Sequence, residues 1–170
     1  LEPNTAFYHS PPTLPDDDSA WAMQQRCQDE LAGHGYAQYE TSAYARDGRR
    51  CHHNLNYWRF GDYLGIGAGA HGKITTVSAQ AIRRTAKVKH PRAYLEAAAG
   101  EARSDAPQVI DPAQAGLEFM MNALRLNEGF PLELYRARTG LPLATVERPL
   151  ARAAELGLIE RDALAIRPSA

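Results

Sequence analysis

Two adjacent histidines beside two large aromatic residues form the first candidate site of the sequence. The run reads His52, His53, Asn54, Leu55, Asn56, Tyr57 and Trp58. Imidazole ligates iron, and aromatic faces pack against flat rings. Neither histidine has a second ligand at metal-site spacing, however, so a loop of ordinary hydrogen-bonding side chains also explains the run. The residue types leave both interpretations open.

A second candidate site is the glycine-rich run over residues 65–72, which reads Gly-Ile-Gly-Ala-Gly-Ala-His-Gly. Glycine lets the backbone approach a ligand closely, and the carboxyl end of a strand is where α/β folds bind ligands. The run is not a clean dinucleotide-binding pattern, because no clear helix follows it and no acidic residue stands at the expected distance. A tight structural turn is the alternative.

Basic residues gather in a third cluster, which consists of Arg83, Arg84, Lys87, Lys89, His90 and Arg92. A charge run of this kind is usually a solvated face. The functional alternative is contact with propionate or phosphate groups, which the arginine fork suits.

The chain has two cysteines, Cys27 and Cys51, which lie far apart in sequence. Two such thiols form no disulfide framework and match no zinc pattern. They are also too few for a four-iron cluster, which needs at least three protein thiolates. We therefore expect reduced thiols in a cytoplasmic protein and no metal site in this chain.

Length and charge narrow the function classes. The 170 residues fit one domain, or one domain with a small appendage, and the formal net charge of −1 gives no reason to expect nucleic acid. No apolar run approaches the roughly 20 residues of a membrane span. The first nine residues do not read as a signal peptide, and the start without Met suggests that upstream sequence has been lost.

The elements that would position these clusters follow an α/β order. An acidic start and closing glycines predict a helix over 17–32, and aromatic residues predict a strand over 36–40. A polar loop over 46–61 and a short buried strand over 63–67 come next. This order is consistent with the last units of a barrel or of a doubly wound sheet.

The polar stretch over 101–111 is the predicted domain boundary, preceded by a short alanine-rich helix that ends near Gly100. A helix from Pro112 follows. Its spacing predicts core positions at Leu117, Met120, Met121 and Leu124.

Two further helices are expected over 132–138 and 143–156, and Pro149 should kink the second or shift its start. A hairpin over 158–160 and 164–166 closes the chain. Three helices and a hairpin predict a winged helix.

Several segments together carry a resemblance to one family. They are residues 2–5, 39–46, 53–58, 62–71, 87–92 and 119–126, of which 53–58 reads His-Asn-Leu-Asn-Tyr-Trp. In this order they resemble oxygen-independent coproporphyrinogen III oxidase-like radical-SAM proteins, and the His-Asn-x-x-Tyr-Trp motif is typical of the heme-chaperone branch. The resemblance covers nearly the whole chain, as the C-terminal portion of the family.

The resemblance implies a fold and a domain division. Residues 1–100 would be the C-terminal units of a radical-SAM barrel, a partial TIM-type barrel that carries the heme-motif loop. Residues 101–170 would be a small helical, winged-helix-like domain.

Site residues and cofactors also follow from the resemblance. It assigns heme binding to His53, Asn54, Tyr57 and Trp58. The glycine-rich turn resembles the barrel end that contacts S-adenosylmethionine, with Gly67, Ala70 and His71 as the candidate residues. The implied cofactors are heme and, in the full-length parent, S-adenosylmethionine and a 4Fe-4S cluster.

The family's Cys-x-x-x-Cys-x-x-Cys loop is absent, so we expect this chain alone to be inactive and to hold no catalytic residue. The implied function of the parent is to bind heme and deliver it to heme proteins. The enzymatic alternative is oxidative decarboxylation of coproporphyrinogen III. A third alternative is a winged-helix protein-binding module over 112–167, in which Glu147 and Glu155 disfavour contact with nucleic acid.

The expected partners are heme or porphyrin and recipient heme proteins. An unpaired strand edge would favour a homodimer. That dimer, and peripheral membrane association of the parent, are left open by the sequence.

Overall fold

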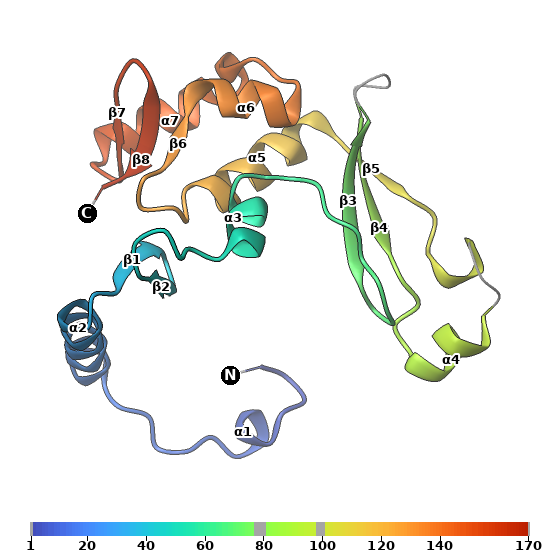
Figure 1. Ribbon diagram of the computed structural model, residues 1–170, viewed down its shortest axis with the longest axis horizontal. Helices are drawn as coiled ribbons and strands as arrows, with labels where there is room; N and C mark the ends of the chain where they lie inside the picture. Colours follow the sequence, from blue (N-terminus) through green and yellow to red (C-terminus); the bar gives the residue numbers. More distant parts are fainter. Residues whose placement is uncertain (1, 77–80, 98–100, 170) are drawn as a thin grey trace.

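The computed structural model describes residues 2–76, 81–97 and 101–169, and Figure 1 shows the arrangement of the elements. The helices are Ala6–His9 (α1), Asp17–Gly33 (α2), His52–Trp58 (α3), Pro91–Glu96 (α4), Pro112–Ala123 (α5), Leu132–Thr139 (α6) and Glu147–Glu155 (α7), with 3-10 turns at Glu101–Arg103 (η1) and Leu143–Val146 (η2). The strands are Ala37–Glu40 (β1), Ala43–Ala45 (β2), His71–Thr76 (β3), Ala81–Ala86 (β4), Gln108–Ile110 (β5), Phe130–Pro131 (β6), Ile159–Arg161 (β7) and Ala165–Pro168 (β8).

The helix predicted over 17–32 is confirmed as α2. The Asp16 carboxylate accepts a hydrogen bond from the Ser19 N–H at 2.7 Å, which caps the first turn. None of its residues is buried in this chain, and Trp21 and Met23 are both exposed. Figure 1 shows α1 and α2 (blue) standing apart from the C-terminal helices.

The strand predicted over 36–40 is confirmed as β1, which pairs antiparallel with β2. A bridge between Glu40 and Leu126 and a hydrogen bond from the Thr41 N–H to the Arg125 carbonyl join this hairpin to the chain just after α5. Residues separated by more than 80 positions in sequence therefore lie side by side.

The strand predicted over 63–67 is wrong. Only Tyr63 pairs, through a bridge to Lys73, while Leu64 and Ile66 are 76% and 87% exposed. Closely spaced glycines interrupt the ladder, since Gly67 and Gly69 take positive φ. The sheet that does form is β3-β4-β5, and its strands pair antiparallel.

The core of the C-terminal half lies between α5, α6, α7 and the sheet β6-β8-β7. Phe119 is fully buried on α5, with Ala115 and Ala123 one turn away on either side. The prediction of core positions at Leu117 and Met121 is wrong, because these side chains are 61% and 67% exposed. The buried face is formed by Phe119 with the small residues Ala115 and Ala123, and a search for large apolar residues alone does not identify it.

The remaining C-terminal elements follow the prediction closely. Gly140 ends α6 in the left-handed conformation. Pro149 lies in the first turn of α7, where its missing N–H costs no hydrogen bond, and a 3-10 turn precedes the helix. The predicted hairpin is confirmed as β7 and β8, and β6 pairs with β8 as a third strand.

The expected boundary over 101–111 contains β5, which pairs with β4 from the preceding half. Ile82 and Ile110 belong to the same core cluster as Phe119. The two halves thus share packing, and the division at residue 100 stays a prediction. The predicted end of the alanine-rich helix near Gly100 lies outside the described residues, and the helix itself is α4, which ends at Glu96.

Candidate functional site: the two faces of helix α3

The histidine-containing run forms a helix rather than the predicted loop. Within the polar stretch over 46–61, α3 begins at His52 and ends at Trp58. Leu55 and Trp58, three positions apart, supply an apolar stripe that packs on Tyr39 and Leu126. The sequence contains this short apolar stripe, but two apolar residues among polar ones are too weak a pattern to predict a helix.

All four predicted heme-binding residues lie on α3. Because positions i and i+4 share a helix face, His53 lies beside Tyr57 and Asn54 beside Trp58. His53 is exposed, while the other three side chains are partly buried. The helix therefore presents His53 to solvent with a partly buried Tyr57 beside it, and it turns Trp58 toward the core.

Trp58 is held in place by the C-terminal half. The Arg125 guanidinium lies over its indole ring, 4.3 Å from the centroid. Arg125 also donates through Nη2 to Glu40 Oε2 and to Ser42 Oγ, each at 3.1 Å. Glu40 is 1% exposed, so its carboxylate depends on this ion pair and on the Ser42 hydroxyl.

Three aromatic rings lie in a row at the outer face of α3, two from the helix and one from the segment that follows it. The centroids of His53 and Tyr57 are 4.8 Å apart in an edge-to-face arrangement. Those of Tyr57 and Tyr63 are 4.4 Å apart with the planes tilted by 43°. Tyr63 was not among the predicted heme-binding residues, because it comes from the segment after the helix and only the tertiary fold brings it to Tyr57.

The segment that carries Tyr63 is fixed by a buried lysine. Lys73 Nζ donates to the Phe60 carbonyl at 3.0 Å and to Asp62 Oδ1 at 3.2 Å. Burial lowers the pKa of Lys73, while the Asp62 carboxylate acts to raise it. Asn56 adds a hydrogen bond from Nδ2 to the Asp62 carbonyl at 2.9 Å, which ties α3 to the same segment.

The predicted S-adenosylmethionine contacts lie away from α3. Gly67 and Ala70 belong to the turn before β3, and His71 is the first residue of that strand. Figure 1 shows this end of β3 near α4. The N–H groups of Gly69 and Ala70 donate to the Val88 and Gly67 carbonyls, whereas a Cβ on Gly67 would meet no atom within 4 Å.

The basic cluster spreads over several elements. Arg83 and Arg84 lie on β4 and Arg92 on α4, and Lys87, Lys89 and His90 fall between them. Arg92 pairs with Glu96, and Arg84 pairs with Glu118 of α5 at 2.6 Å.

The two cysteines of the sequence are both exposed, Cys27 on α2 and Cys51 just before α3. Among the described residues, no group of three His, Cys, Asp or Glu side chains is arranged to hold a metal ion. The residues present thus do not fit an iron–sulfur cluster, which is held by three or four thiolates.

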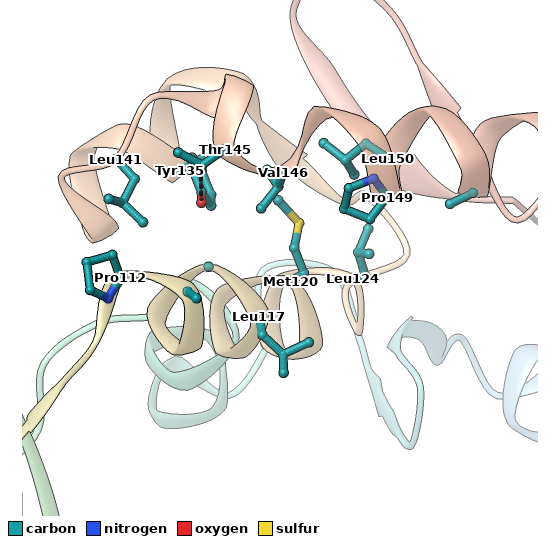
Figure 2. Close-up of a pocket in the computed structure, with 13 residues that line it drawn as sticks. Pro112, Leu117, Met120, Leu124, Tyr135, Leu141, Thr145, Val146, Pro149 and Leu150 are labelled. Atoms are coloured by element: carbon teal, nitrogen blue, oxygen red, sulfur yellow. Dashed lines mark hydrogen bonds between the residues drawn. The ribbon is translucent and has the colours of Figure 1, made fainter.

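An apolar cavity lies between α5, α6 and α7, with a volume of about 600 Å³ (Figure 2). Figure 2 shows Met120 of α5 and Leu124, the residue after α5, facing Val146 and Leu150 across it. Its main polar feature is the pair of Tyr135 and Thr145 hydroxyls, 2.8 Å apart. None of the predicted heme or S-adenosylmethionine contacts lines this cavity.

Within the residues that the structure describes, no helix is long and apolar enough to cross a membrane.

Comparison with known proteins points to one family. Residues 110–170 match the family model described as the HemN C-terminal domain. Over 141 residues the chain is 48% identical to the heme chaperone HemW of Escherichia coli (strain K12), a stretch that covers 83% of this chain and 36% of that protein. It is 44% identical to the heme chaperone HemW of Haemophilus influenzae over 163 residues, which cover 96% of this chain and 41% of that protein.

A solved structure shares the fold. The chain matches coproporphyrinogen III oxidase (HemN) from Escherichia coli, described as a radical SAM enzyme, with a TM-score of 0.63 and 16% sequence identity. The match covers 92% of this chain and 38% of the oxidase. The chain therefore has an α/β fold like that part of the oxidase, and it spans about two fifths of the length of the relatives it matches.

Proposed function

Because the chain belongs to the family of HemN and HemW proteins and matches its C-terminal portion, we propose that it is the C-terminal part of a heme chaperone and that it contacts heme through the outer face of α3. The parent protein would bind heme and deliver it to recipient heme proteins. Heme is the cargo in this proposal.

The observation that carries the proposal is the pairing of an exposed His53 with Tyr57 on one helix face. A neutral imidazole ligates heme iron, and an adjacent aromatic ring covers part of the macrocycle. His52 is exposed too, but it lies five positions before Tyr57, so it does not share the helix face that carries the Tyr57 ring. This difference supports our proposal that His53 is the iron ligand.

The other two motif residues take supporting roles. Trp58 packs inward under Arg125, so it holds the helix in place rather than offering a free ring face. Asn54 lies one turn before Trp58 on the same side of α3. We propose that it borders the cargo without ligating iron.

Finer features of the parent are part of the same proposal. The turn with Gly67, Ala70 and His71 would face S-adenosylmethionine at the end of a partial TIM-type barrel. A 4Fe-4S cluster would be ligated by cysteines outside this sequence. Residues 101–170 would form a winged-helix-like unit. The cytoplasm is the proposed location. No specific observation favours the oxidase activity, since the similarity to the oxidase shows the fold alone.

The test is a hemin titration of the 170-residue chain followed by Soret absorbance. We expect His53→Ala to lose the ligated Soret band and His52→Ala, the matched control, to keep it. Both side chains are exposed, so both variants should unfold at the same urea concentration as the wild type. Unchanged binding by His53→Ala would overturn the assignment and leave α3 a purely structural element.

A further inference from the structure

Tyr63 lies along the free edge of β3 as if it were one residue of an additional strand. Its N–H donates to the Lys73 carbonyl and its carbonyl accepts from the Lys73 N–H, both at 2.9 Å. In the sheet order β3-β4-β5, β3 is the edge strand on that side. The backbone pairing fixes where the Tyr63 side chain stands relative to the sheet.

The pairing register places Tyr63 in a row with Lys73 and Arg84. Lys73 is paired with Tyr63 on one side and with Arg84 on the other, and directly opposed residues project from the same face of a sheet. Arg83 is paired with Ile74, so it projects from the opposite face. Of the two neighbouring arginines, only Arg84 shares the face of Tyr63.

The surroundings of Tyr63 agree with this placement. Burial raises the pKa of the Tyr63 hydroxyl, and the nearby Arg84 charge acts in the opposite direction. The hydroxyl therefore stays neutral at physiological pH. Its ring, 4.4 Å from that of Tyr57, continues the aromatic surface from α3 onto the sheet.

We propose that Tyr63 and Arg84 complete the tetrapyrrole site begun by His53 and Tyr57, with the Tyr63 ring packing on the macrocycle and Arg84 holding a propionate carboxylate. This inference rests on the proposed function of α3. It follows from geometry, because Trp58 is covered by Arg125 and Tyr63 supplies the second ring next to Tyr57.

Arg84 has donors to spare for a carboxylate. A guanidinium carries five N–H groups, and in the described part of the chain the contact of Arg84 is that of Nη2 with Glu118, a carboxylate that also accepts from Gln114. A bidentate contact between arginine and a carboxylate is among the stronger and more specific polar contacts. The face of the sheet that carries Tyr63 thus pairs a ring with a cation, as a macrocycle with acidic side chains requires.

The first arm of the test compares hemin affinity among Tyr63 variants of the 170-residue chain. Tyr63→Leu keeps apolar bulk but removes the ring, and we expect it to raise the hemin dissociation constant about tenfold with the ligated Soret band unchanged in position. Tyr63→Phe keeps the ring and should bind within about twofold of wild type. Tyr44→Leu is the control, since this partly buried tyrosine lies on β2 in the other hairpin.

The second arm uses the two neighbouring arginines as a matched pair. Arg84→Gln should weaken hemin binding about tenfold and leave binding of the dimethyl ester of hemin, which has no free carboxylates, unchanged. Arg83→Gln should bind both ligands as the wild type does. Urea unfolding of each variant checks that affinity is compared between folded proteins.

The outcomes separate this inference from the function on which it rests. If His53→Ala loses the Soret band while Tyr63→Leu binds hemin as tightly as wild type, the Tyr63 assignment is overturned and the function of α3 stands. Equal losses of hemin and of its ester in Arg84→Gln would overturn the carboxylate role. If His53→Ala also binds normally, both proposals fail together.

Discussion

The protein contains two aromatic clusters with similar ring spacing and opposite surroundings. In the inner cluster, Phe119 makes edge-to-face contacts with Phe60, Phe130 and Tyr135 at centroid distances of 5.9, 5.0 and 5.1 Å. All four of these rings are buried. In the outer cluster, the centroids of His53 and Tyr57 are 4.8 Å apart and those of Tyr57 and Tyr63 are 4.4 Å apart, and His53 is exposed.

The similar ring distances in the two clusters show that ring geometry alone does not distinguish a structural cluster from a binding surface. The inner rings use their faces against the core, where burial gives each large side chain about 1.5–3 kcal/mol. The outer rings are only partly buried, and partly uncovered rings next to an imidazole are what a flat cargo needs. Substitutions in the two clusters should therefore move different observables.

The largest expected effect is on stability in the inner cluster. Phe119→Ala should lower the free energy of unfolding by about 3–5 kcal/mol, because it removes a fully buried ring that touches three others. Tyr57→Ala should lower it by about 1 kcal/mol or less and mainly weaken hemin binding. Urea unfolding followed by circular dichroism measures both. Equal destabilisation by the two variants would show that the outer cluster is core as well.

The next effect concerns the clamp between the C-terminal half and α3. Arg125→Met should cost about 1–3 kcal/mol, since it leaves the buried Glu40 without its ion pair. Arg125 is itself about one third exposed, so the cost falls below that of a fully buried pair.

A control variant and a rescuing double variant test this prediction. Arg152→Met removes an exposed pair with Glu155 and should change stability by less than about 0.5 kcal/mol. The double variant Glu40→Gln with Arg125→Met should recover part of the loss, because no unpaired charge remains buried. Additive losses in the double variant would mean that the two side chains do not interact.

Hydroxyl removal provides a third contrast between the clusters. Tyr135→Phe should cost about 1 kcal/mol, because the buried Tyr135 hydroxyl is bonded to Thr145 Oγ1 at 2.8 Å. Tyr57→Phe should leave both stability and hemin affinity near wild type, since the outer rings act through their faces. Thermal unfolding and hemin titration of the two variants test this. A marked loss of hemin affinity in Tyr57→Phe would assign the hydroxyl a direct polar contact.

The parts of the fold that sequence could predict are those with local signals. The helix α2 has an acidic cap and closing glycines, and the β7–β8 hairpin has its turn between apolar strands. The helix α3 was missed because seven residues carry only a two-residue apolar stripe, and its stability comes from contact with Tyr39 and Leu126. Local patterns do not encode such tertiary support.

The site residues also fall into those that lie close together in sequence and those that only the tertiary fold brings together. The four motif residues fall within one short segment, so the sequence could propose them together. Tyr63 and Arg125 join them through the β3 pairing and the end of α5, contacts that span up to 67 positions between Trp58 and Arg125. The assignment of Arg84 rather than Arg83 depends on strand register, which a one-residue shift would reverse.

The smallest expected effect lies at the junction of the two clusters. Lys73 lies over the Phe60 ring of the inner cluster, 4.1 Å from its centroid, and pairs with Asp62, the residue before Tyr63. Burial acts to raise the pKa of Asp62, but hydrogen bonds from Thr75 and from Lys73 outweigh it, so the pKa lies below its ordinary value of 3.8. A carboxyl group with a lowered pKa in the folded state stabilises the fold at neutral pH.

The sign of the pH dependence follows from that shift. The stabilisation by Asp62 is complete above the unfolded-state pKa of 3.8 and disappears as the pH falls through the lower folded-state value. Asp62→Asn should therefore be less stable than wild type by about 0.5 kcal/mol at pH 7, a small cost because the side chain is 43% exposed. Urea midpoints of both proteins from pH 7 to pH 2 should converge in acid. Other carboxylates titrate equally in both proteins, so parallel curves would mean that Asp62 does not tie the outer cluster to Lys73.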